Sequence, residues 1–153
     1  MYLSNDPLSG CPDDQISSFF GNARAKSVAM NSTLSKTDQL ERRFIAFAAS
    51  ILNLSANLPK SPQGRHICSQ ILRSGTASAA NYGEARGAES RADFIHKLRI
   101  VFKELNETTI WLEVIARSSM LPLDATAPVV AENRELCRVI ATSIKTARAT
   151  MEG

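Results

Sequence analysis

The chain has 153 residues, of which 44% are hydrophobic and 22% are charged, and its formal net charge is +3. This composition is typical of a globular domain with one core. It excludes a membrane span, because no apolar run approaches the ~20 residues that cross a bilayer. The first residues lack a basic leader and an apolar signal core, so we expect a cytoplasmic protein.

Residues 1–35 show no sustained periodicity and are rich in Ser, Asn, Gly and Asp. They predict an N-terminal extension that is mostly irregular. A helix is then expected over residues 37–58, after the N-cap chemistry of Ser35–Asp38 and before Pro59. Its large apolar residues recur at alternating steps of four and three, as one buried face requires. These residues are Leu40, Phe44, Phe47, Ile51, Leu54 and Leu58.

A second helix is expected over residues 62–83, with proline at its first position. Its inner face consists of Ile67, Ile71, Gly75 and Ser78. The run of small residues from Ser74 to Ala80 lets two helix backbones approach closely. A third helix is expected over residues 90–118, starting at a capping box formed by Ser90 and Asp93. The inner face of this third helix consists of Phe94, Leu98, Val101, Leu105, Thr108, Leu112 and Ile115.

The fourth helix is expected over residues 126–151, with a start between Asp124 and Pro128. Its inner positions are Val129, Leu136, Val139 or Ile140, Ile144 and Ala147. No segment alternates polar and apolar residues as a half-buried strand does, and the connections are short. The sequence therefore predicts an all-α fold, an antiparallel up-and-down four-helix bundle over residues 36–153.

Some large apolar residues lie beside the inner faces of the first and third helices and exceed what one bundle seam can bury. We expect them to be partly exposed and to form the interface of a homo-oligomer. Two alternatives are that residues 1–35 cover them, or that rotated helices bury them. The residues are Ile45, Leu52, Ile95, Phe102 and Trp111.

From Gln70 to Leu121 the sequence resembles the bacterial family of 23S rRNA intervening-sequence proteins. That family combines Arg, a run of small residues, Asn-x-x-Glu, a basic and Ser-rich turn, Phe-x-x-x-Leu and a Leu-rich helix containing Glu. The matching residues here are Arg73, Ser74–Ala80, Asn81, Glu84, Arg86, Ser90, Phe94, Leu98, Leu105 and Glu107.

The resemblance implies a left-handed antiparallel bundle that assembles as a ring, often a homopentamer, with no established enzymatic activity. A related branch of this fold, the accessory variability determinant of diversity-generating retroelements, binds nucleic acid and a reverse transcriptase. A shared fold does not by itself carry function. The resemblance therefore favours an adaptor role by analogy.

Basic residues before and along the third predicted helix are candidates for binding phosphate groups of RNA or DNA. They are Arg86, Arg91, Arg99, Lys103 and Arg117. The alternative is that these charges are solvated and paired with nearby carboxylates. No set of aromatic residues accompanies them, so recognition of single-stranded bases has little support.

Arg73, Asn81 and Glu84 form a second polar group, which we interpret as structural. A partly buried arginine that bonds a carboxylate and an amide can fix the register between two helices. Ligand binding is the alternative for this group.

Metal and enzyme chemistry find no support in the sequence. Only Asp93-x-x-His96 has the Glu-x-x-His spacing of a di-iron bundle, and no nucleophile has a recognisable local motif. We therefore expect no enzyme, no metal site and no cofactor. The favoured function is an oligomeric scaffold that binds structured RNA or DNA, the alternative is a protein-interaction module, and a small-ligand or metal bundle is a weaker third.

Overall fold

The structure of the protein is a computed structural model that describes residues 34–150. These residues form four α-helices and no strand, namely α2 (Lys36–Ala56), α3 (Pro62–Arg86), α4 (Arg91–Arg117) and α5 (Leu123–Ala149). The all-α prediction is confirmed. Almost all of the predicted extension, residues 1–33, lies outside the described residues. The chain divides into two units within α2, and the packing below concerns the unit that begins at Leu40.

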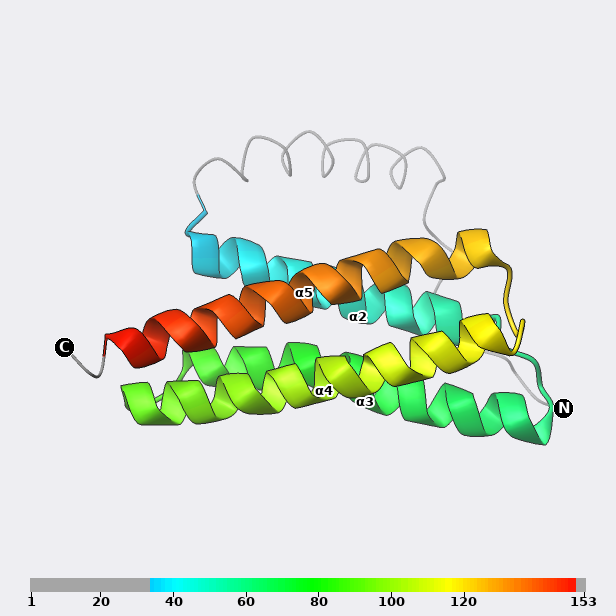
Figure 1. The fold of residues 1–153 in the computed structure, drawn as a ribbon, viewed down its shortest axis with the longest axis horizontal. Coiled ribbons are helices and arrows are strands. Elements are labelled where there is room, and N and C mark those ends of the chain that lie inside the picture. The colour runs from blue at the N-terminus through cyan, green and yellow to red at the C-terminus, as the bar shows by residue number, and fades with distance from the viewer. Residues whose placement is uncertain (1–33, 151–153) are drawn as a thin grey trace, which may run out of the picture. The chain divides into compact units, whose positions relative to one another are not determined.

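Successive helices run antiparallel, as expected for an up-and-down bundle (Figure 1). Glu41, early in α2, pairs with Arg86 at the end of α3, while Ser55, late in α2, accepts a bond from the Cys68 thiol early in α3. Helices α4 and α5 are joined in the same way. The Arg91 guanidinium at the start of α4 donates to the carbonyl of Thr150, just after α5, at 2.9 Å. None of the four helices has the length and apolarity that crossing a membrane requires.

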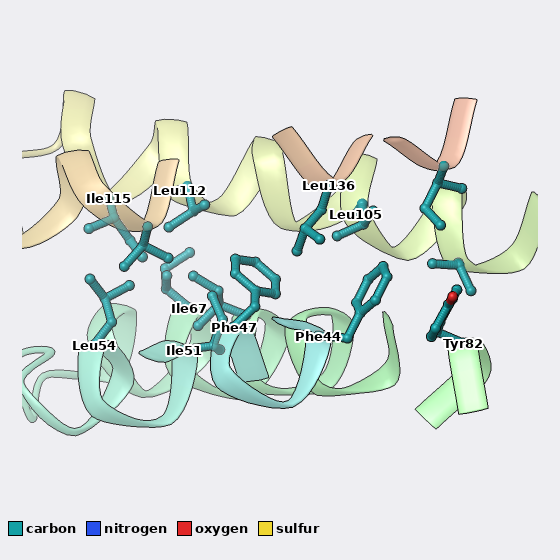
Figure 2. Packing of buried hydrophobic residues seen from close by; sticks show 14 of the residues in the cluster. Phe44, Phe47, Ile51, Leu54, Ile67, Tyr82, Leu105, Leu112, Ile115 and Leu136 are labelled. Atoms are coloured by element: carbon teal, nitrogen blue, oxygen red, sulfur yellow. The ribbon is translucent and has the colours of Figure 1, made fainter. Parts of the chain in front are cut away.

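The predicted inner faces meet in one core, shown in Figure 2. The Phe44 ring of α2 stacks on the Tyr82 ring of α3, with ring centroids 4.8 Å apart. Either Val139 or Ile140 was expected on the inner face of the fourth helix. Ile140 takes this position, because it is fully buried while Val139 is only partly buried. The fully buried large apolar residues are Phe44, Phe47, Ile51, Ile71, Leu98, Val101, Leu105, Leu112, Ile115, Leu136 and Ile140.

Helix α2 ends at Ala56, two residues before its predicted end. Two further boundaries differ because a glycine or a proline, residue types that often end helices, lies inside the helix. Helix α3 continues through Gly83 to Arg86 and is capped by Gly87. Helix α5 begins at Leu123, so that Pro128 lies inside it. Proline there removes one helical bond to the Asp124 carbonyl. Both residues are exposed, so water can satisfy that carbonyl.

The predicted capping box of α4 forms in a modified way. The Ser90 hydroxyl accepts a bond from the Asp93 amide at 3.1 Å, and the Asp93 carboxylate accepts from the Glu89 amide at 3.3 Å. Lys97, one turn later, lies 3.1 Å from the same carboxylate. The bond from Lys97 is the main cause that lowers the pKa of Asp93 below its ordinary value.

Candidate nucleic-acid interface

A buried amide fixes the register of α4 against α5. The Asn133 amide nitrogen donates to the Leu105 carbonyl at 3.1 Å and to the Thr109 hydroxyl at 2.7 Å. Asn133 is almost fully buried, and these bonds satisfy its amide nitrogen, while its amide oxygen has no hydrogen-bond partner among the described residues. Together with the bond from Arg91 to Thr150, they set the first half of α4 beside the second half of α5.

Two of the predicted phosphate-binding residues lie exposed and unpaired on α4. Arg99 and Lys103 are one turn apart, so they point to the same side of the helix. No ion pair or hydrogen bond engages either side chain within residues 34–150. No described residue therefore competes with a ligand for these two cations.

The other three predicted residues are engaged. Arg86 pairs with Glu41 of α2. Arg117 pairs with Glu113 on its own helix at 2.9 Å, and Arg91 donates to the carbonyl at the end of α5. The alternative of internally paired charges therefore describes Arg86 and Arg117 but not the two unpaired cations of α4.

Helix α5 contributes cations that the sequence reasoning missed. Arg134, Lys145 and Arg148 are exposed, and none has an ion-pair partner in the described part of the chain. Lys145 follows Arg134 by about three turns, and Arg148 follows Lys145 by about one turn, so all three lie along one side of the helix. This recurrence is visible in the sequence, but the apolar pattern that predicts the helix does not indicate it.

The two sets of cations flank the outer side of the contact between α4 and α5. Successive residues of a helix are rotated by about 100° around its axis. Around α4, this rotation places Arg99 and Lys103 next to Thr109 on the side that faces away from the core. Around α5, it places Arg134 and Arg148 next to Asn133 in the same way. Thr109 and Asn133 are the pair that joins the two helices. We call this surface the α4/α5 basic face, defined by Arg99, Lys103, Arg134, Lys145 and Arg148.

The carboxylates of α4 and α5 that could neutralise this face have other partners. Glu132 binds Arg43 of α2 through two hydrogen bonds of 2.5 and 2.9 Å, and this bonding raises the pKa of Arg43. Glu113 and Glu135 pair with arginines on their own helices. Among residues 34–150 the basic face thus keeps a positive charge that no carboxylate pairs with, and such a surface attracts polyanions.

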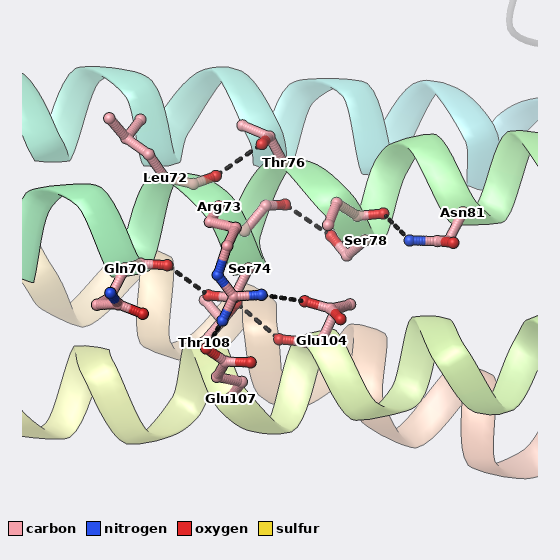
Figure 3. Close-up of polar contacts among 12 residues, drawn as sticks. Gln70, Leu72, Arg73, Ser74, Thr76, Ser78, Asn81, Glu104, Glu107 and Thr108 are labelled. Carbon is pink, nitrogen blue, oxygen red and sulfur yellow. Dashed lines mark hydrogen bonds and ion pairs between the residues drawn. The ribbon is translucent and has the colours of Figure 1, made fainter.

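Arg73 fixes register, but not through its predicted partners (Figure 3). Its guanidinium pairs with Glu107 of α4 and lies 3.7 Å from Glu104. Asn81 instead donates to the Ala77 carbonyl of its own helix at 2.8 Å, and Glu84 is exposed. The prediction that Arg73, Asn81 and Glu84 act together is wrong, because Asn81 and Glu84 lie more than two turns from Arg73 along α3.

The small-residue run of α3 also contacts α4 through a buried pair of hydroxyls. The Thr108 hydroxyl lies 2.9 Å from the Ser74 hydroxyl and 2.8 Å from the Glu104 carbonyl. Both residues are fully buried. These bonds satisfy polar groups within the core and specify how α3 and α4 align.

An exposed apolar strip runs along α2. Ile45 and Leu52 are 60% and 52% exposed, and Ala49 and Ala56 lie between and beyond them at helical spacing. We call these four residues the α2 apolar strip. Ile110 and Leu123 are also exposed, at 61% and 73%, and were not predicted.

Of the other predicted interface residues, Ile95 is buried in the bundle, whereas Phe102 and Trp111 are partly exposed, as expected. The expectation that Ile95 is partly exposed is wrong, because it is only 6% exposed. Ile95 and Phe102 precede Thr109 by fourteen and seven residues, so they share the flank of α4 that turns toward α5. Phe102 and Trp111 both pack against the core, and the Trp111 indole donates to Glu107 at 3.3 Å.

Neither cysteine of the described chain has a disulfide partner there. Cys137 is partly buried beside Thr109, and desolvation raises the pKa of its thiol. A raised pKa lowers the fraction of reactive thiolate at neutral pH. No three His, Cys, Asp or Glu side chains among residues 34–150 are placed to hold a metal ion.

Comparison with known proteins identifies a family for most of the chain. The family described as 23S rRNA-intervening sequence protein matches residues 36–142. A crystal structure from Bacteroides thetaiotaomicron, described as a protein with unknown function from the S23 ribosomal protein family, is 36% identical. The match covers 72% of this chain and 99% of that protein, with a TM-score of 0.67. No curated protein matches the sequence.

Proposed function

The chain belongs to the 23S rRNA-intervening sequence protein family, and from the surface of this member we propose a non-enzymatic scaffold that binds structured RNA or DNA. The observation that carries the proposal is the α4/α5 basic face, with five exposed cations that have no carboxylate partner among the described residues. Such a surface attracts phosphate groups and releases their counterions. The scaffold holds phosphates without changing them.

We further propose that the scaffold is a cytoplasmic homo-oligomer that assembles through the α2 apolar strip. Burying Ile45 and Leu52 removes apolar surface from water, and no charged residue interrupts the strip between them. Assembly would place several copies of the basic face in one particle and increase the avidity for a polyanion. Sedimentation at micromolar protein concentration tests the assembly, and a monomer would contradict it.

Charge reversal on the basic face tests nucleic-acid binding. The variant Arg99→Glu, Lys145→Glu changes one cation on each helix, and we expect its affinity for a labelled RNA hairpin or DNA duplex to fall at least about tenfold. Fluorescence anisotropy at low salt measures this change. Sedimentation of the same samples shows whether the assembly is unchanged.

The matched control is Lys60→Glu, Arg65→Glu, which alters the formal charge equally near the connection between α2 and α3. Both control residues are exposed, and within residues 34–150 the Arg65 guanidinium has one hydrogen bond, to the Lys60 carbonyl. We expect this variant to bind much more tightly than the basic-face variant. Equal losses would show that binding follows net charge and not the α4/α5 basic face.

The α2 apolar strip also favours a second candidate function, that of a protein-interaction module. In that case the strip binds a different protein and the positive charge is incidental. Capture of one protein that persists at high salt and is lost in Leu52→Glu would support this function. If the wild-type protein does not bind nucleic acid at low salt, protein interaction becomes the preferred function.

A further inference from the structure

We propose that the α4/α5 basic face binds double-stranded nucleic acid in preference to single strands and without regard to base sequence. This inference rests on the proposed function and specifies the class of ligand. It is carried by the arrangement of the cations in two rows. Arg99 and Lys103 form the α4 row, and Arg134, Lys145 and Arg148 form the α5 row.

The spacing of the rows suits a ligand with two lines of phosphate. Packed helices lie about 8–10 Å apart, and the α5 row extends over fourteen residues, or about 21 Å. The grooves of a B-form duplex are about 6 and 12 Å wide and are bordered by a phosphate backbone on each side. Each row can therefore contact one backbone across a groove, whereas a single strand can follow only one row.

The chemistry of the face also disfavours single strands. Proteins that bind single strands tightly stack the bases on exposed aromatic rings. The phenylalanines, tyrosine and tryptophan of the described chain are all buried or packed against the core. His96 is exposed one turn before Arg99, but it offers a single ring and not a row of them.

The basic face is preformed, which favours a stiff ligand. The buried Asn133 bonds fix α4 and α5 in one register, so the rows keep their separation. A duplex has a persistence length of about 50 nm and loses little freedom on such a surface. A flexible strand would lose conformational entropy to meet the same cations.

Base edges are read by side chains that enter a groove. A face of long cations supported by two helices contacts phosphates and distinguishes sequences little.

Competition binding with matched ligands tests the inference. The probes are a labelled mixed-sequence DNA duplex of about two helical turns, an RNA hairpin of similar length, and the single strands that compose them. We expect the duplexes to bind at least about tenfold more tightly than single strands of the same length, and two unrelated duplex sequences to bind within about threefold.

Variants that change one row at a time test the geometry. The α4-row variant is Arg99→Glu, Lys103→Glu, and the α5-row variant is Lys145→Glu, Arg148→Glu. For a duplex we expect each variant to weaken binding, because each row contacts a different backbone. Loss in only one of the two variants would overturn the two-row geometry.

The outcomes separate this inference from the proposed function. Single strands that bind as tightly as duplexes would overturn the inference and leave nucleic-acid binding in place. A strong preference for one duplex sequence would overturn its sequence independence. Absence of binding to every probe at low salt would overturn the proposed function itself.

Discussion

Replacing Leu105 with alanine is expected to lower the free energy of unfolding by about 2–5 kcal/mol. Leu105 is fully buried at the centre of α4, and its carbonyl accepts the bond from Asn133. The substitution removes buried apolar contacts and leaves a cavity that packed neighbours fill only in part. Urea denaturation followed by circular dichroism measures the loss.

The matched control for this prediction is Ile110→Ala on the same helix. Ile110 is 61% exposed, so its truncation should change the free energy of unfolding by no more than about 0.5 kcal/mol. If Leu105→Ala costs less than about 1 kcal/mol, the register of α4 described here is incorrect. A large loss for Ile110→Ala would indicate that this residue is buried in an assembly.

Substitutions of two glycines in α3 should change stability in opposite directions. A Cβ atom at Gly75 would lie 2.8 Å from two carbons of the Ile51 side chain, which is fully buried. These carbons lie next to the branch point of a buried side chain and have little room to shift, and such overpacking costs about 1–3 kcal/mol. Gly75→Ala is therefore expected to destabilise the bundle, because the gain in helix propensity offsets only part of this cost.

Gly83→Ala provides the comparison. A Cβ atom at Gly83 would meet nothing closer than a Glu41 carboxylate oxygen at 4.0 Å. Alanine should therefore stabilise α3 by about 0.5–1 kcal/mol, since glycine in a helix interior loses more backbone entropy on folding. Thermal melts of both variants measure the difference. Stabilisation by both substitutions would show that α2 and α3 are not in close contact at Gly75, and destabilisation by both would contradict the open space at Gly83.

Much of the fold could be predicted because it depends on local patterns. The spacing of apolar residues identified the inner faces of α2 and α4, and the Ser90 cap located the start of α4. The helix boundaries were less predictable where tertiary packing overrides local preference. Gly83 lies inside α3 and Pro128 lies inside α5, although each is a residue type that often ends a helix.

Less of the candidate site could be predicted, because it depends on how helices face one another. The sequence does not say that Arg73 reaches Glu107 and not Glu84, since that pairing requires the register of α3 against α4. The burial of Ile95 follows from its position on the flank of α4 that meets α5. The contribution of α5 to the basic face likewise appears only when both helices are placed side by side.

The salt dependence of binding to a B-form DNA duplex shows whether the cations of the α4/α5 basic face contact phosphates. Five cations that contact phosphates should give a slope of log K against log salt concentration of about −4 to −5 for each protomer bound. Anisotropy titrations of the wild-type protein over a range of salt concentrations measure this slope. A value in that range is the predicted result. A slope near zero, or no binding at low salt, would contradict the proposal that the α4/α5 basic face binds phosphate.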